Sequence, residues 1–326
     1  MLHITNGDSA VRVMREAGIA GEFLPWRDVL HEGPAPAGLT LGEMSKVRAA
    51  FIAACGWSEE KQAREGFQER DARLATFRDH EEVILWFEHD LYDQLQLLQL
   101  LDWFSARGPG DTRLSIICVD DYLGAMAPER MGELYGTQSR VSSAQLTLGK
   151  DAWAAFCSAD PMGWEALTGK DTAVLPFLAG SVIRHLEQYP SLQNGTNRTE
   201  TQILKAVNAG LSRPGQIFEA SQNDEDARFM GDSTFWIYLN NMLESDPPLL
   251  RMVNADSFAF PTAYPYPEEF RNQHSAITEA GIEVLNNKRD WIEINGIDKW
   301  LGGVHLHSAN IWRWDAAGGR LLKADA

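Results

Sequence analysis

Short apolar runs alternate with helical patterns over the first 120 residues of the chain. Runs of β-type residues predict strands at residues 2–5, 22–26, 83–87 and 114–119. The last two runs are almost continuously apolar, as expected for strands that are buried on both faces of a sheet. Strands that alternate with helices are typical of a parallel sheet with crossover helices. The pattern therefore predicts a Rossmann-like α/β domain at the start of the chain.

The segments between these runs have helical periodicity. Helices are predicted at residues 10–17, 41–54, 59–78 and 91–104. In the last of these, leucines recur at helical spacing and form a stripe that we expect in the core.

A different pattern occupies the middle of the chain. From about residue 128 the strand signals give way to short helical segments separated by prolines, and the strongest predicted helix covers residues 173–189. Residues 190–198 are polar and rich in turn formers, which indicates a linker.

The last third of the chain predicts a winged-helix-like α+β domain. Its predicted elements are three helices, two short β-runs that form a wing, and a closing helix, at residues 199–209, 213–222, 233–243, 249–253, 258–260 and 278–285. Asp232 or Ser233 is expected to be the N-cap of the third helix. The tail that follows is rich in tryptophan, and Gly302-Gly303 suits a hairpin, so we expect the tail to pack back as strands.

A length of 326 residues favours about two domains. We predict a Rossmann-like domain over residues 1–127, a helical segment and linker over 128–195, and a winged-helix-like domain with a tryptophan-rich β tail over 196–326.

The chain is strongly acidic, with 46 Asp and Glu residues against 29 Lys and Arg residues and a net charge of −17. This charge repels nucleic-acid backbones and anionic lipids unless a local basic patch is present. Cys55, Cys118 and Cys157 lie far apart, which excludes a disulfide framework or a thiolate zinc site and indicates a reducing compartment. The sequence contains neither a signal-peptide core nor an 18-residue apolar run, so we expect a cytoplasmic protein that does not contact a membrane.

Polar residues follow every predicted strand of the first domain. In an open parallel sheet ligands bind at the carboxyl ends of the strands, so we expect a site there for a small hydroxyl- or phosphate-bearing ligand such as a nucleotide. The predicted site consists of the residues at these strand ends, namely Asn6, Gly7, Asp8, Ser9, Asp28, His31, Glu32, Glu88, His89, Asp90, Gln94 and Asp120. The alternative is that Asp8, Ser9 and Asp90 merely cap the helices that follow.

Several carboxylates and two imidazoles in one crevice repel one another unless a cation or protons intervene. Oxygen-rich sites suit Mg²⁺ or Mn²⁺, and we predict that Asp8, Asp28 and Glu88 hold such an ion. His31 or His89 would then move a proton during metal-assisted hydrolysis. The remaining residues, Asn6, Gly7, Glu32, Asp90, Gln94 and Asp120, are expected to contact the ligand.

A second enzymatic interpretation uses Ser9 as a nucleophile. Gly7-Asp8-Ser9 resembles the opening block of the GDS-type lipases and esterases, and Asp28 and His31 have a D-x-x-H spacing. In that family the D-x-x-H lies near the C-terminus, and the separate glycine and asparagine blocks have no counterpart in this sequence. The pattern therefore favours Ser9 as a helix cap.

The winged-helix pattern favours a different class, a non-catalytic regulator or adaptor. Its expected recognition helix, within residues 231–245, contains no Lys or Arg, which argues against DNA as the partner. A protein partner remains open. If Phe235, Trp236 and Tyr238 are exposed they form a contact surface, whereas burial would make them core.

Longer motifs resemble one family, the bacterial domain-of-unknown-function 1835 family. The motifs similar to its N-terminal signature are residues 6–10, 26–34 and 85–95, and those similar to its companion C-terminal blocks are residues 198–204, 231–236 and 295–306. The likeness spans nearly the whole chain. It supports the predicted architecture and implies no particular activity.

Overall fold

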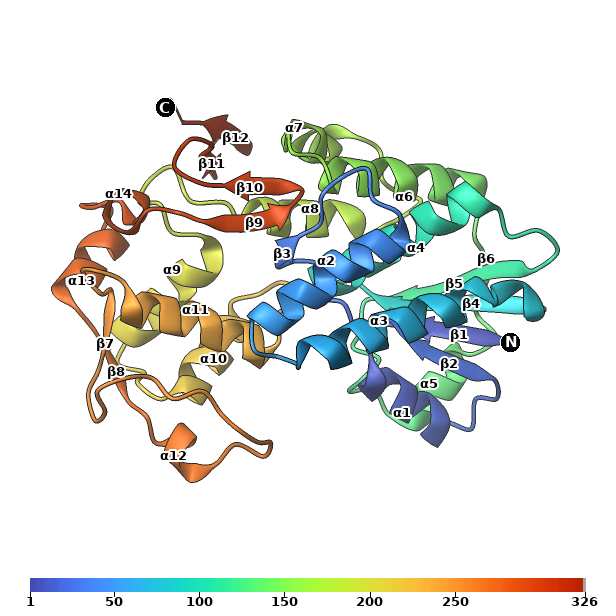
Figure 1. Cartoon of the computed structure of the whole chain (residues 1–326), viewed down its shortest axis with the longest axis horizontal. Helices are drawn as coiled ribbons and strands as arrows, with labels where there is room; N and C mark the ends of the chain where they lie inside the picture. The colour runs from blue at the N-terminus through green and yellow to red at the C-terminus, as the bar shows by residue number, and fades with distance from the viewer. Residues whose placement is uncertain (325–326) are drawn as a thin grey trace. The chain divides into compact units, whose positions relative to one another are not determined.

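A five-stranded sheet forms the centre of the first of two units. The computed structural model describes residues 1–324, which divide into one unit of residues 1–183 with 300–305 and a second unit of residues 184–299 with the residues from 306 onward. The strand order of the sheet is β2-β1-β4-β5-β6 (Figure 1). Its members are β1 (Leu2–Thr5), β2 (Glu22–Pro25), β4 (Glu82–Glu88), β5 (Arg113–Val119) and β6 (Ser139–Arg140).

Four of these strands are parallel, and only the short β6 runs antiparallel to its neighbour. All residues of β4 are buried, as its apolar run predicts for a central strand. The predicted parallel sheet with intervening helices is therefore confirmed, and each of its four predicted strands is found to within one residue at either end.

The strand order reverses between β1 and β4. α1 (Asp8–Glu16) connects β1 to β2 on one side, whereas β4 pairs with β1 on the other side. Ligands of open parallel sheets bind outside the carboxyl ends of the strands at such a switch point. The residues that follow β1 and β4 are therefore the expected ligand-binding residues.

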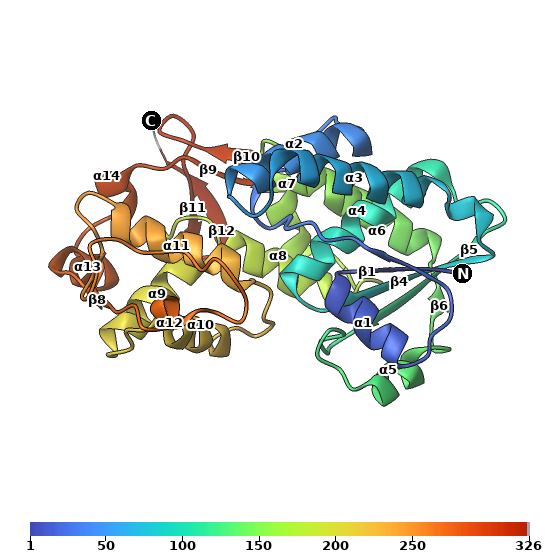
Figure 2. The same cartoon turned by 60° about the horizontal axis from the view of Figure 1, so that its bottom comes forward.

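Helices cover both faces of this sheet (Figure 2). On one face, α1 and α5 (Pro128–Leu134) pack against Ile84 and Trp86 of β4 in a single apolar cluster. The helices on the opposite face are α2 (Leu41–Ala54), α3 (Glu60–Ala75), α4 (Leu91–Arg107) and α6 (Ser143–Phe156). Burial from both sides explains why the central strands carry so few polar residues.

The predicted helix at residues 173–189 is wrong in length. The observed helix is α8 (Leu178–Leu186), because Pro176 disfavours helical backbone at the residue before it. Short helical turns complete this region and its surroundings, namely η1 (Phe77–Asp79), α7 (Met162–Glu165) and η2 (Ala166–Gly169).

A three-stranded sheet joins two segments that are far apart in the sequence. β3 (Gly33–Pro34) pairs in parallel with β9 (Lys299–Gly302), and β10 (Val304–Leu306) lies on the other side of β9. The backbone N–H of Ala35 donates to the carbonyl oxygen of Gly302 at 2.8 Å. The tail therefore forms strands, as predicted, and residues 300–305 dock beside the loop that follows β2.

The turn of this hairpin has no room for a side chain. A Cβ at Gly303 would lie 1.8 Å from the carbonyl oxygen of Cys157 at the end of α6. We expect Gly303→Ala to destabilise the first unit by about 1–3 kcal/mol, because backbone must move to admit the methyl group. Urea denaturation checks this, with Gly132→Ala as the control, since nothing lies within 4 Å of a Cβ there. Equal midpoints for the two variants would contradict the expectation.

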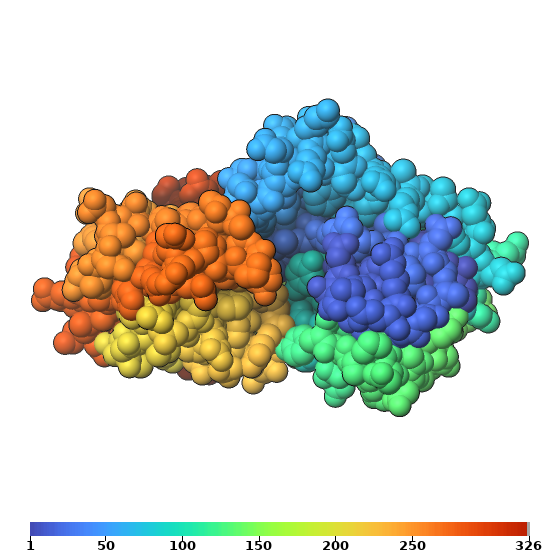
Figure 3. Space-filling model, turned by 90° about the horizontal axis from the view of Figure 1, so that it is seen from below, coloured from blue at the N-terminus to red at the C-terminus, as the bar shows by residue number. Residues whose placement is uncertain are grey.

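The second unit contains a group of helices and an antiparallel ribbon. Its helices are α9 (Arg198–Asn208), α10 (Pro214–Asn223), α11 (Asp232–Glu244), α12 (Glu268–Arg271), α13 (Glu279–Leu285) and α14 (Trp291–Asn295). The strands are β7 (Leu250–Met252), β8 (Ser275–Ile277), β11 (Trp312–Asp315) and β12 (Arg320–Lys323), paired antiparallel as β7 with β8 and β11 with β12. Figure 3 shows the orange insert between β7 and β8 lying against the yellow helices of this unit.

Two predictions for the second unit are wrong. Residues 258–260 form no strand, and the partner of β7 is β8. The backbone N–H of Ala259 donates to Gln273 Oε1 and its carbonyl oxygen accepts from Gln273 Nε2, so these groups do not pair with a strand. The N-cap of α11 is Gly231. Asp232, one of the predicted caps, instead accepts a hydrogen bond from the Tyr266 hydroxyl.

The aromatic side chains of α11 are buried. Phe235, Trp236 and Tyr238 are 0%, 1% and 5% exposed. Phe235 and Trp236 both contact the ring of Phe218 on α10. These side chains therefore belong to the core of the second unit, and the predicted alternative of an exposed contact surface is wrong.

The three cysteines are free thiols, as their spacing predicted. Burial raises the pKa of Cys118 to about 12, so this thiol stays protonated at neutral pH. Within residues 1–324, no helix combines the length and the apolar character needed to cross a bilayer.

Candidate functional site at the ends of β1 and β4

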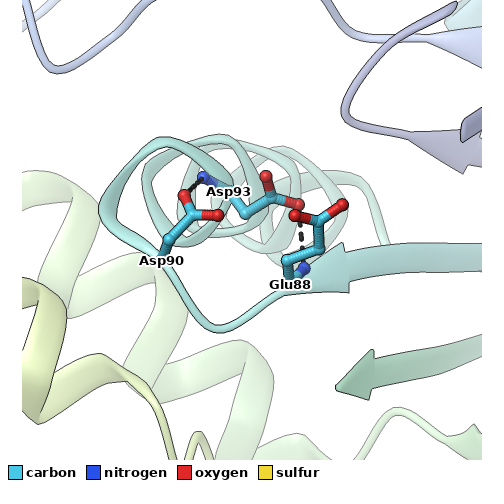
Figure 4. Close-up of side chains that lie close together, drawn as sticks. All are labelled: Glu88, Asp90 and Asp93. Atoms are coloured by element: carbon cyan, nitrogen blue, oxygen red, sulfur yellow. Dashed lines mark hydrogen bonds between the residues drawn. The ribbon is translucent and has the colours of Figure 1, made fainter. Parts of the chain in front are cut away.

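Three buried carboxylates converge where β4 ends and α4 begins. Glu88 is the last residue of β4, Asp90 is the N-cap of α4, and Asp93 lies in its first turn. One oxygen of each lies within 4.8 Å of the others, and the three side chains lie side by side in Figure 4. In residues 1–324, no other group of three or more His, Cys, Asp or Glu side chains is as close.

Local hydrogen bonds explain why the chain places these residues together. Asp90 Oδ1 accepts from the backbone N–H of Asp93 at 3.1 Å, which caps α4. Asp93 Oδ1 accepts from the backbone N–H of Glu88 at 2.8 Å and closes the turn between strand and helix. The cap that the sequence predicted for Asp90 is therefore confirmed.

Asn6 connects this cluster to the end of β1. Its Nδ2 donates to Glu88 Oε1 at 2.7 Å and to Asp93 Oδ2 at 3.0 Å. The backbone N–H of Leu123, in the loop after β5, donates to the same Glu88 oxygen at 2.8 Å. Segments that follow three neighbouring strands thus meet at the switch point of the sheet.

Burial raises the pKa of all three carboxyl groups, because the charged forms lose their hydration. Repulsion adds to this effect: burial and the Glu88 charge together raise the pKa of Asp90 to about 8, and the pKa of Asp93 lies well above its usual value. Hydrogen bonds from Asn6 and Leu123 oppose the rise at Glu88. The cluster therefore retains protons near neutral pH unless a cation neutralises it.

Further predicted residues surround the cluster. Gln94 Nε2 donates to the carbonyl oxygen of Glu88 at 2.7 Å. The Tyr92 hydroxyl donates to the carbonyl oxygen of Asn6 at 3.3 Å, and the ring of His31 meets the Tyr92 ring edge-on at 5.9 Å. The ring of His89 lies 5.2 Å from that of Tyr122.

Asp28 belongs to a separate buried ion pair. Its Oδ1 accepts from Arg48 Nε at 2.9 Å, and both side chains are completely buried. Arg70 Nη1 lies 3.9 Å from Asp28 Oδ2. This predicted metal ligand is therefore not part of the carboxylate cluster at Glu88, and its charge is already neutralised by guanidinium groups.

Arg48 also organises the loop that carries Glu32. Its Nη1 donates to the carbonyl oxygen of Glu32 at 2.7 Å, and its Nη2 donates to that of Val29 at 2.7 Å. The loop between β2 and β3 is therefore fixed by one buried arginine.

The other predicted residues lie at the surface. Asp8 forms a two-bond ion pair with Arg27, at 2.7 and 2.6 Å, and Ser9 and Asp120 are exposed. Gly7 is the N-cap of α1, so the predicted caps Asp8 and Ser9 are wrong. A Cβ at Gly7 would meet nothing within 4 Å. The predicted trio Asp8, Asp28 and Glu88 is therefore distributed over three places.

Asp93 is the member of the cluster that the sequence reasoning missed. It stands three residues after the helix cap Asp90, in the first turn of α4. From this position its carboxylate accepts a hydrogen bond from the backbone at the end of the preceding strand. The spacing of Glu88, Asp90 and Asp93, across a strand end and the first helical turn, is the signal that could have identified it.

No protein-family model matches the chain, and neither does any curated protein sequence. The resemblance to the domain-of-unknown-function 1835 family stays a prediction.

Proposed function

We propose that the first unit binds a divalent cation, Mg²⁺ or Mn²⁺, at Glu88, Asp90 and Asp93 and uses it to hydrolyse a small phosphate-bearing ligand. The observation that carries this proposal is the set of three buried carboxylates with oxygens within 4.8 Å of one another. Their position at the switch point of a parallel sheet, as in a Rossmann-like domain, supports a ligand site.

The charge of the cluster supports a cation. Glu88, Asp90 and Asp93 have oxygens within 4.8 Å of one another, where carboxylates repel each other unless they share a proton or a cation lies between them. Glu88 Oε1 and both oxygens of Asp93 already accept hydrogen bonds, which orient the cluster. A cation would take the place of the shared proton, and carboxylate oxygens are the ligands that Mg²⁺ and Mn²⁺ prefer.

Two histidines, His89 and His31, are the candidates for proton transfer. A bound cation would activate a water molecule and hold a phosphate oxygen. His89 lies between Glu88 and Asp90 in the sequence, and its buried Nδ1 forms no hydrogen bond within residues 1–324. We therefore assign His89 as the first candidate for the proton acceptor and His31, which contacts Tyr92, as the second.

Calorimetric titration with Mn²⁺ tests the cation site. We expect tighter binding at pH 8.5 than at pH 6.5, because the cation must displace protons from the cluster. Glu88→Gln should weaken binding at least tenfold, whereas Asp120→Asn, an exposed carboxylate after β5, should bind as the wild type does. Equal affinities of the two variants, or no binding at either pH, would refute the site.

A phosphate-release assay then tests the reaction. With Mn²⁺ or Mg²⁺ and a panel of nucleotides and sugar phosphates, we expect turnover that is lost in Glu88→Gln and strongly reduced in His89→Gln. Binding of Mn²⁺ without turnover of any phosphate ester would leave the cation site in place and refute the hydrolase.

The second candidate is a ligand-sensing regulator in which the second unit acts on a partner. It is favoured by the succession of α9, α10, α11 and the β7–β8 ribbon, which is the order of elements in a winged helix. A gel shift with duplex DNA at low salt tests the DNA version, and we expect no shift, because α11 contains neither Lys nor Arg. Under either candidate, the cytoplasmic location stays a prediction.

A further inference from the structure

The second unit contains a cavity of about 470 Å³ beside α10 and α12. Figures 1 and 2 both show these two helices next to each other. The cavity is within the size range of small-molecule sites. Its lining residues come from the start of α10 and from the insert that contains α12.

Two arginines line this cavity. Arg213 immediately precedes α10, and Arg271 is the last residue of α12. Both are exposed, and within residues 1–324 neither guanidinium group forms a hydrogen bond or an ion pair. In a chain with a net charge of −17, two unpaired guanidinium groups at one cavity favour an anionic ligand.

The backbone adds to this preference. α10 begins beside Arg213, and no side chain caps its first turn. Gly215 in that turn lines the cavity, and a Cβ there would meet nothing within 4 Å. The partial positive charge of a helix N-terminus therefore acts together with the two arginines on an anion such as a phosphate group.

The remaining lining residues suit an aromatic base and a sugar. Tyr266 lines the cavity and is half-buried, its ring contacts the rings of Trp236, Tyr264 and Phe270, and its hydroxyl is held by Asp232. The exposed part of this ring is the aromatic contact that the cavity offers to a base. Glu219 and Glu268 provide carboxylate oxygens, which accept hydrogen bonds from ribose hydroxyls. Gln216 and Asn272 carry carboxamides, which both donate and accept hydrogen bonds as the edge of a base requires.

We propose that this cavity binds a nucleoside 5′-monophosphate. The phosphate contacts Arg213, Arg271 and the start of α10, and the base stacks on Tyr266. The two carboxylates favour a ligand that carries hydroxyl groups beside its anionic group, because their oxygens accept hydrogen bonds from ribose hydroxyls and repel further negative charge. This site is separate from the carboxylate cluster of the first unit and does not depend on the function proposed for it.

The test is a calorimetric titration of the full chain with AMP, adenosine and inorganic phosphate, in the presence of EDTA so that no divalent cation is bound. We expect AMP to bind at least tenfold more tightly than either adenosine or phosphate. Arg213→Gln and Arg271→Gln should each weaken AMP binding at least fivefold. The matched control is Arg251→Gln, an exposed arginine on β7 outside the cavity, which should bind AMP as the wild type does.

Variants of Tyr266 test the stacking contact. Tyr266→Leu should weaken AMP binding at least fivefold, and Tyr266→Phe, which keeps the ring, should restore it. Three results would overturn the proposal: no binding of AMP at millimolar concentration, equal affinity for AMP and inorganic phosphate, or AMP affinity that is unchanged in both cavity arginine variants. Loss of AMP binding in Glu88→Gln but not in the arginine variants would place the nucleotide at the first unit and would also overturn it.

Discussion

Replacing Asp90 with Asn is expected to stabilise the protein at pH 8 by about 2–4 kcal/mol in the absence of divalent cations. Burial and the Glu88 charge raise the pKa of Asp90 to about 8, whereas the same group in the unfolded chain titrates near its usual value of about 4. Each unit of difference corresponds to about 1.4 kcal/mol, and the coupling of the three carboxyl groups reduces the amount that one residue contributes. Asparagine caps helices as well as aspartate does, so the start of α4 is preserved.

The same pKa values set the direction of the pH dependence. Between about pH 4 and pH 8 the unfolded chain has released the Asp90 proton, whereas the folded protein still holds it. The contribution of Asp90 to the free energy of unfolding therefore falls as the pH rises through this window, and the raised pKa values of Glu88 and Asp93 act in the same direction. Burial lowers the pKa of His185 to about 3, which acts in the opposite direction below about pH 6.5. Asp90→Asn should therefore gain stability relative to the wild type as the pH rises from 4 to 8.

Urea denaturation from pH 4 to pH 8.5 measures this effect. Asp120→Asn removes an equivalent charge from an exposed position after β5 and should follow the wild-type profile to within about 0.5 kcal/mol. A stability difference between Asp90→Asn and the wild type that does not grow from pH 4 to pH 8 would contradict the pKa assignment.

Replacing Arg48 with Met is expected to cost about 3–5 kcal/mol. The substitution leaves the Asp28 carboxylate completely buried without its nearest cation, and removing one partner of a buried ion pair has a cost of this size. It also removes the donors that satisfy the carbonyl oxygens of Glu32 and Val29. Thermal and urea unfolding measure the loss.

The double variant Arg48→Met, Asp28→Asn separates the two causes. Removing the stranded charge should recover part of the stability, and the remainder reports the lost bonds to the loop. Arg64→Met on α3, where the arginine side chain is 52% exposed, is the control and should change stability by less than about 0.5 kcal/mol. If Arg48→Met and Arg64→Met lowered the free energy of unfolding by the same small amount, the buried ion pair would not stabilise the loop.

The sheet was predictable from the sequence because its signal is local. The apolar runs of β4 and β5 are what burial on both faces requires, and their alternation with helices indicates a parallel sheet. The β7–β8 ribbon of the second unit was less predictable. β7 pairs with β8, which follows the insert, and pairing between segments that far apart depends on tertiary contacts that a local sequence pattern does not contain.

The residues of the candidate site were also predictable only where their signal is local. Glu88 and Asp90 were predicted because they follow a recognisable strand, and Asp93 could have been found from its helical spacing to Asp90. Asp28 also follows a strand, but its partner Arg48 comes from α2, and only the folded chain reveals that its charge is already neutralised. A position at a strand end is therefore informative about a site only when the partners of the side chain are known.

The pairing of β3 with β9 has a consequence for the order in which the protein is made. Gly33 leaves the ribosome before its partner Leu301, which follows 268 residues later in the chain. Until then the backbone beside the β2–β3 loop has no strand to pair with, so the first unit completes its fold only after residues 184–299 of the second unit have been translated. A ribosome-bound chain stalled before residue 299 should therefore expose this loop to proteases that the finished protein resists.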